Sequence, residues 1–124
     1  MESIIKSALS GNSGTGVRND EFDHIRISVI GVGGSGNNTV NRLKKLGVKG
    51  ADLIACNTDR QHLNIVEEGV KKFLIGKSIT KGLGAGGYPE VGAKCAEMDR
   101  EQIKKELEGS HLVFVCAGMG GGTG

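Results

Sequence analysis

The stretch HIRISVIGVGGSGNN, residues 24–38, decides the fold of this chain because it joins a strand pattern directly to a glycine-rich turn. Ile25, Ile27 and Val29 alternate with polar residues, which is the pattern of a β-strand with one buried face. Beyond the glycines, residues 37–47 carry apolar side chains at helical spacing. The stretch therefore predicts a strand, a tight turn and a helix in succession, the unit from which parallel sheets are built.

The alternation of strand and helix continues along the chain. We expect strands at residues 24–32, 51–59, 71–76 and 111–118, and helices at 37–47, 60–69 and 89–109, the last one broken once. This order predicts an α/β fold: the N-terminal part of a doubly wound, Rossmann-like parallel sheet with strand order 3-2-1-4, truncated after the fourth strand. Right-handed crossovers then bring every strand-to-helix loop to one edge of the sheet.

Composition bounds the class of protein. Residues 1–23 lack periodicity and are rich in Ser, Gly, Asn and Asp, which predicts a flexible tail ahead of one partial domain at 24–124. The net charge of +2 and the aromatic content of 3% do not indicate a nucleic-acid partner. The longest apolar run, 112–117, is too short to insert into a membrane, and no signal peptide is visible. Three widely spaced cysteines favour a reduced, cytoplasmic setting over disulfides or a metal site.

Glycine is unusually concentrated, since 13 of the 22 glycines fall in three clusters at 31–36, 82–87 and 118–124. Such loops let the backbone approach an anion, and a following helix N-terminus adds N–H groups and a positive dipole. The first cluster, GVGGSG, fits G-x-G-x-x-G, to which Ser35 and the two asparagines that follow the cluster would add hydrogen bonds. A purely structural turn can have the same pattern, so the pattern on its own is weak evidence for a ligand site.

A dinucleotide site of a Rossmann-type oxidoreductase is an alternative reading of the first cluster. It requires an acidic residue about 20 positions on, at the end of the second strand. Asp52 lies at the start of that strand and Asp59 lies past its end. Three glycine-rich loops at one edge also suit a ligand with more phosphate charge than a dinucleotide. GKS at 76–78 lacks the glycine five residues earlier that a P-loop requires, although Lys77 or Lys81 can still lie near phosphate.

The remaining loops leave two questions open. GLGAGG at 82–87 is either a flexible surface loop or a lid that faces a terminal phosphate. Asp59 either holds Mg²⁺, which prefers a carboxylate together with phosphate oxygens, or caps the helix that follows it. The three histidines have no triad or metal-site spacing and are interpreted as structural.

Four motifs in order carry a family resemblance: GVGGSGNN, NTD, KGLGAGGYPE and the terminal GGGTG. GGGTG looks like the start of the tubulin signature G-G-G-T-G-T-G. From residue 24 to residue 124 the chain closely resembles FtsZ, the prokaryotic tubulin-like cell-division GTPases, and NNT and GAGGYPE are similar to archaeal members. The resemblance implies that GTP or GDP is bound between these loops, where the residue chemistry above makes Asp59 the candidate ligand of Mg²⁺. The implied nucleotide-binding residues are Gly33, Gly34, Ser35, Gly36, Asn37, Asn38, Asn57, Asp59, Gly84, Ala85, Gly86, Gly87, Gly120, Gly121, Gly122, Thr123 and Gly124.

The resemblance also implies the behaviour of the whole protein. Family members polymerise head to tail at the cytoplasmic division site, an acidic loop of the next subunit completes the hydrolytic site, and other segments bind membrane-anchor proteins. Those segments and the guanine-reading residues are absent here, so no residue is assigned as catalytic and we expect the fragment to be inactive. The signature stops before its second Thr-Gly, which we interpret as a partial gene or fragment. A tubulin-like scaffold that binds nucleotide with little hydrolysis remains an alternative.

Overall fold

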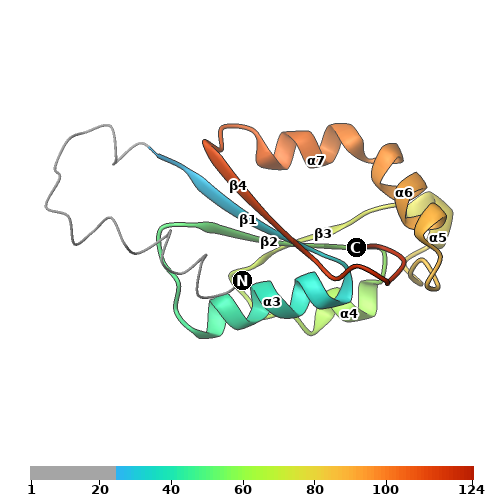
Figure 1. Ribbon diagram of the computed structural model, residues 1–124, viewed down its shortest axis with the longest axis horizontal. Coiled ribbons are helices and arrows are strands. Elements are labelled where there is room, and N and C mark those ends of the chain that lie inside the picture. The colour runs from blue at the N-terminus through green and yellow to red at the C-terminus, as the bar shows by residue number, and fades with distance from the viewer. Residues whose placement is uncertain (1–24) are drawn as a thin grey trace, which may run out of the picture.

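The computed structural model describes residues 25–124, which form one four-stranded, all-parallel sheet with the order β3-β2-β1-β4 (Figure 1). The predicted α/β class and the strand order 3-2-1-4 are confirmed. The tail predicted at residues 1–23 lies outside the described residues. The elements in chain order are β1 (Ile27–Val32), α3 (Gly33–Lys45), β2 (Asp52–Asn57), α4 (Arg60–Asn64), β3 (Lys71–Leu74), α5 (Lys77–Thr80), α6 (Pro89–Met98), α7 (Arg100–Leu107) and β4 (Leu112–Ala117).

Strand β1 is the centre of the sheet. Its Val29 pairs with Leu53 of β2 on one side and with Phe114 of β4 on the other. The four-residue strand β3 pairs only with the last four residues of β2, starting from Ile54 and Lys71. Because all strands run in the same direction, their carboxyl ends and the loops that follow them lie at one edge of the sheet.

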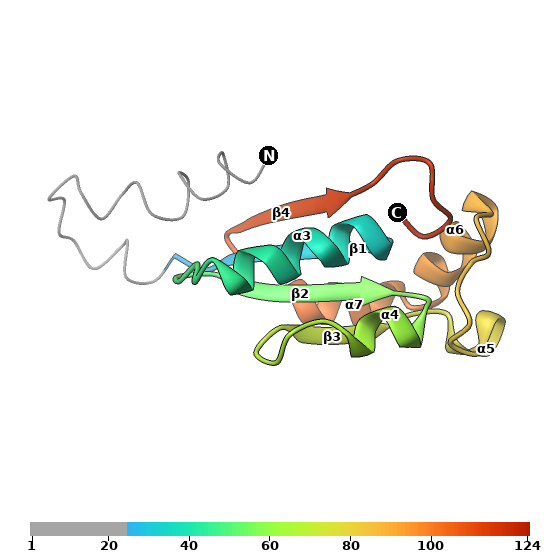
Figure 2. The ribbon, with the colours of Figure 1, turned by 90° about the horizontal axis from the view of Figure 1, so that it is seen from below.

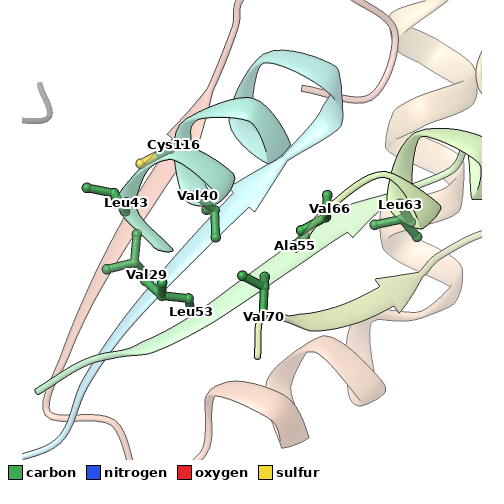
Figure 3. Close-up of a cluster of buried hydrophobic side chains, with 9 residues drawn as sticks. All are labelled: Val29, Val40, Leu43, Leu53, Ala55, Leu63, Val66, Val70 and Cys116. Atoms are coloured by element: carbon green, nitrogen blue, oxygen red, sulfur yellow. The ribbon is translucent and has the colours of Figure 1, made fainter. Parts of the chain in front are cut away.

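One face of the sheet is covered by α3 and α4 (Figure 2). Val40 and Leu43 of α3 are fully buried, as is Val29 beneath them on β1. Each such side chain contributes about 1.5–3 kcal/mol by leaving water, so this layer fixes α3 against the sheet. Figure 3 shows the whole cluster, which consists of Val29, Val40, Leu43, Leu53, Ala55, Leu63, Val66, Val70 and Cys116.

The opposite face is covered by α6 and α7 (Figure 1). There Ile30, Ile54 and Cys56 of the sheet pack with Cys95 of α6. Burial, and secondarily the charge of Asp99, raises the pKa of the Cys56 thiol to about 12. The cysteines are therefore small apolar core residues, and none of the three forms a disulfide.

The break expected in the third helix is confirmed at Asp99, which separates α6 from α7. Its carboxylate accepts a hydrogen bond from the Gly76 N–H and so ties the break to the turn after β3. Most boundaries differ from the prediction by one to three residues, and two differ by more: α3 starts at Gly33 instead of residue 37, and α4 stops at Asn64 instead of residue 69. Within residues 25–124, no helix is long and apolar enough to cross a membrane.

The short helix α5 was not expected. It occupies only Lys77–Thr80, between Gly76 and Lys81, which both adopt left-handed backbone conformations. A single helical turn between two such residues has no apolar periodicity, so the sequence pattern could not reveal it.

Candidate functional site

A cavity of about 650 Å³ opens at the carboxyl edge of the sheet. Its walls are the loops that follow all four strands, as the topology of a parallel sheet predicts. Its volume is in the range of small-molecule sites. The lining residues are Val32, Gly33, Gly34, Ser35, Asn57, Thr58, Asp59, His62, Leu83, Gly84, Ala85, Gly86, Gly87, Gly118, Met119, Gly121, Gly122, Thr123 and Gly124.

The first wall is the N-terminus of α3. The helix starts at Gly33, so residues 33–36 of the glycine cluster form its first turn and Gly31 belongs to β1. No side chain caps this terminus and no acidic residue lies in the first turn. Its N–H groups and the positive end of a 13-residue helix therefore face the cavity without a side-chain anion to neutralise them. This arrangement suits a bound phosphate.

The second wall is the turn after β2, and a buried amide pair holds it in place. Asn37 of α3 donates through Nδ2 to the carbonyl oxygens of Gly31 (2.9 Å) and Cys56 (3.1 Å). Its Oδ1 accepts from Asn57 Nδ2 at 2.8 Å. Asn57 Oδ1 in turn accepts from the N–H of Thr58 at 2.8 Å. The first and second walls are thus one hydrogen-bonded unit.

Asp59 is the only acidic side chain among the lining residues. Its Oδ1 accepts from the N–H groups of Gln61 (3.0 Å) and His62 (3.3 Å), so the side chain is the N-cap of α4. The capping interpretation is confirmed. These bonds use one carboxylate oxygen, and the other, Oδ2, lies on the side of Gly84 in the third loop. No cluster of three or more metal-ligating side chains occurs within residues 25–124.

The third wall, residues 83–87, is tied to the second at its start. Gly84 N–H donates to the Thr58 carbonyl oxygen at 3.2 Å, and Arg60 N–H donates to the Gly82 carbonyl oxygen at 3.0 Å. Gly86 and Gly87 have positive φ angles of 65° and 79°, which other residues adopt only with strain. The loop is therefore anchored at one end and turns back toward α6 at the other.

The fourth wall is the terminal loop, residues 118–124, and it packs on its neighbours through backbone. Thr123 Oγ1 lies 2.7 Å from Thr58 Oγ1, which links this loop to the second wall. A Cβ on Gly92 of α6 would overlap the carbonyl oxygen of Gly122. A Cβ on Gly122 would come within 2.8 Å of Ala85 Cβ. Absence of side chains here lets the loop contact both α6 and the third wall.

Most of the sequence-predicted residues line this cavity, but four do not: Gly36, Asn37, Asn38 and Gly120. Gly36 packs against the Cys116 carbonyl oxygen, and Asn37 is fully buried. Lys77 and Lys81 do not line the cavity either. Whether any of these residues contacts a nucleotide stays a prediction.

Sequence reasoning missed two polar lining residues, Thr58 and His62. Thr58 lies between two residues that were predicted, and its hydroxyl contacts Thr123. His62 follows Asp59 by three residues in α4, so helical spacing puts both on the same face. That spacing was the signal that could have found it.

The lining residues include no lysine or arginine. A bound anion would therefore be held mainly by backbone N–H groups, hydroxyls and the α3 dipole, with Asp59 as the one fixed negative charge. This electrostatic pattern suits a ligand whose charge is partly neutralised by its own cation.

Comparison with known proteins matches residues 26–124 to the model of the Tubulin/FtsZ family, GTPase domain. Cell division protein FtsZ 2 of Methanocaldococcus jannaschii is 54% identical over 121 residues, which cover 98% of this chain and 32% of that protein. Among solved structures, the empty FtsZ dimer of M. jannaschii has a TM-score of 0.77 at 49% identity and covers 81% and 29% of the two chains. The GTPγS-bound protofilament of CetZ2 from Haloferax volcanii has a TM-score of 0.68 at 31% identity, covering 81% and 32%. The chain thus spans about a third of the length of these relatives.

Proposed function

The chain belongs to the tubulin/FtsZ family, and on that premise we propose that it is the guanine-nucleotide-binding part of an FtsZ-like cell-division GTPase. The observation that carries the proposal is the cavity itself. Three glycine-rich loops and the NTD turn meet there around the uncapped N-terminus of α3. No comparable observation favours the oxidoreductase alternative, because no acidic residue other than Asp59 lines the cavity.

Each wall has a part in the proposed complex. Backbone N–H groups of Gly33–Ser35 and of Gly121–Gly124 would bind the α- and β-phosphates, with the Thr123 hydroxyl beside them. Residues 84–87 of the third wall would face the γ-phosphate, because Gly84 lies against the Asp59 side chain, where the cation would bind. These loops recognise phosphate and leave the base to other residues.

Mg²⁺ fits the same arrangement. The capping bonds of Asp59 use Oδ1, so Oδ2 remains as a hard oxygen donor beside the third wall. Magnesium is commonly held by one or two carboxylates together with phosphate oxygens and water. When bound, the cation would neutralise phosphate charge that no lysine or arginine of the cavity neutralises.

Nucleotide binding is tested by equilibrium dialysis of the full-length protein against GTP, GDP, ATP and NAD. We expect GTP and GDP to bind; NAD binding without GTP binding would overturn the proposal. Ser35→Asp adds a negative charge in the first turn of α3, where it stabilises the helix but repels phosphate. We expect this variant to fold and to lose at least tenfold in affinity. Asn41→Asp adds the same charge to α3 outside the cavity and is the matched control.

Head-to-tail self-association is the second part of the proposal. Leu83 and Met119, at the mouth of the cavity, are 83% and 89% exposed. Two large apolar side chains on the rim of a polar cavity suit a protein surface that closes over it. The similar structures include an FtsZ dimer and a CetZ2 protofilament. We propose that the next subunit covers this mouth and supplies the acidic group that hydrolysis requires.

Assembly is measured by light scattering of the full-length protein with GTP. Leu83→Ser with Met119→Ser should reduce assembly while nucleotide affinity of the monomer changes less than threefold. Assembly without turnover would favour the scaffold alternative. We further propose that the polymers form in the cytoplasm at the division site and bind anchor proteins through other segments. Fluorescence microscopy of the labelled full-length protein in dividing cells tests this location.

A further inference from the structure

His62 lines the cavity but has no part in the proposal above. It is the third residue of α4, and its backbone N–H is bonded to the Asp59 cap. The imidazole is half-buried and therefore has a defined place at the wall. Its position is fixed from both ends, by the cap of its own helix and by contacts of its ring with α3.

The ring lies against the first turn of α3. A Cβ on Gly34 would lie 3.3 Å from His62 Cε1 and 3.7 Å from each ring nitrogen. Nε2 lies 3.3 Å from Asn38 Oδ1, one helical turn farther along α3. Because the two nitrogens flank Cε1, Nδ1 lies on the side of the ring away from Asn38, and His62 as a whole lines the cavity.

His62 also differs chemically from the other lining side chains. No lysine or arginine lines the cavity, and the Asn57 amide donates to Asn37 instead. Among the lining residues, the imidazole is thus the one side-chain nitrogen turned to the phosphate-binding end of α3. Histidine Nδ1 is a hydrogen-bond donor when it carries its proton, and a bond to an ionised acceptor is among the strong ones.

We propose that His62 carries a proton on both ring nitrogens in the nucleotide complex, so that Nε2 donates to Asn38 Oδ1 while Nδ1 donates a hydrogen bond to a phosphate. This inference rests on the proposed function and adds a side-chain contact to a site otherwise built from backbone and hydroxyl groups. The sequence alone suggested that His62 is a structural residue. The inference makes it a nucleotide-contacting residue instead.

Two amide substitutions of His62 distinguish the roles of its two ring nitrogens. Asparagine at position 62 puts its NH₂ near the place of Nδ1, and glutamine puts it near the place of Nε2. We expect His62→Ala and His62→Gln to weaken GDP and GTP binding by about 10- to 100-fold, the usual value of a bond to a charged group. His62→Asn should stay within about threefold of the unsubstituted protein. GMP tested alongside identifies the phosphate, since only a ligand that retains it shows the loss.

The control is His111→Asn at the opposite edge of the sheet, where His111 Nδ1 accepts from the Arg26 N–H. It should not change nucleotide affinity. Urea unfolding of every variant confirms the fold. The inference is overturned if all three His62 variants keep their nucleotide affinity, or if His62→Asn loses affinity while His62→Gln retains it. Either result leaves the proposed function standing. Absence of GTP binding by the unsubstituted full-length protein overturns both.

Discussion

Replacing Asn37 with alanine is expected to destabilise the fold by about 3–4.5 kcal/mol, because this side chain joins two walls of the cavity. It is fully buried and makes three hydrogen bonds, to the carbonyl oxygens of Gly31 and Cys56 and to the amide of Asn57. A buried bond contributes about 1 kcal/mol net, and a buried partner left unsatisfied costs about 1–3 kcal/mol. At about 1–1.5 kcal/mol for each of the three bonds, the loss is a large part of the stability of a small domain.

Urea unfolding followed by far-ultraviolet circular dichroism measures this loss, since the chain has no tryptophan and a single tyrosine. Asn38→Ala is the matched control: the side chain is exposed and makes one contact of 3.3 Å, so we expect less than about 1 kcal/mol. Asn37→Asp keeps the shape but removes both donors and buries a carboxylate, and should be no more stable than alanine. If Asn37→Ala and Asn38→Ala unfold within 1 kcal/mol of each other, the buried amide pair does not join the walls as described.

Four further predictions concern the same chain. Asp59→Asn should keep the α4 cap but lose the Mg²⁺-dependent gain in GTP affinity, whereas Asp59→Ala should also cost about 1 kcal/mol in urea unfolding; a normal Mg²⁺ response in the Asn variant would leave capping as the only role. Gly92→Ala should lower both stability and GTP affinity although alanine normally stabilises a helix by about 1 kcal/mol, because its Cβ overlaps the Gly122 carbonyl oxygen; a gain in the unfolding midpoint would contradict this packing. Burial, and secondarily Asp99, raises the pKa of the Cys56 thiol from 9.0 to about 12, so above pH 9 the unfolded thiol loses its proton first. The free energy of unfolding should therefore fall by about 1 kcal/mol between pH 9 and pH 10 because of this thiol. Cys56→Ala should fall less over the same range, and equal slopes would refute this. The purified 124-residue chain should release no phosphate from GTP above background, since Asp59 is the only acidic side chain lining its cavity; measurable turnover would show that a second acidic side chain is not required.

The fold was predictable because the strands are short apolar runs, and the segments between them carry apolar residues at helical spacing. The central strand β1 and the apolar run of β4 pair in register over six residues, which places the first and fourth loops side by side. Strand order followed from the doubly wound topology, and the position of the cavity followed from strand direction. These features depend on burial and chain connectivity, both of which leave a pattern in the sequence.

The ends of the elements were less predictable because they depend on single backbone conformations. Helix α4 was expected to reach residue 69 but stops at Asn64, and Val66 then donates its N–H to the Leu63 carbonyl oxygen in a tighter turn. Val66 is buried in the core like Leu63, so the helical spacing of apolar residues continues beyond the real end of the helix. A prediction from that spacing therefore makes α4 too long. Tertiary packing of the turn, rather than helix propensity, decides where α4 stops.

The glycines show most clearly what sequence reasoning could not separate. A glycine in a loop after a strand indicates a close backbone approach, but not which partner approaches. Gly34 and Gly121 line the cavity, whereas Gly36 lies against the Cys116 carbonyl oxygen of β4. Gly92 lies in α6, outside every glycine cluster, and yet its missing side chain is what admits the Gly122 carbonyl oxygen. Some glycines of this chain therefore make room for a ligand and others bring its walls together, and the second group shapes the cavity without touching what it holds.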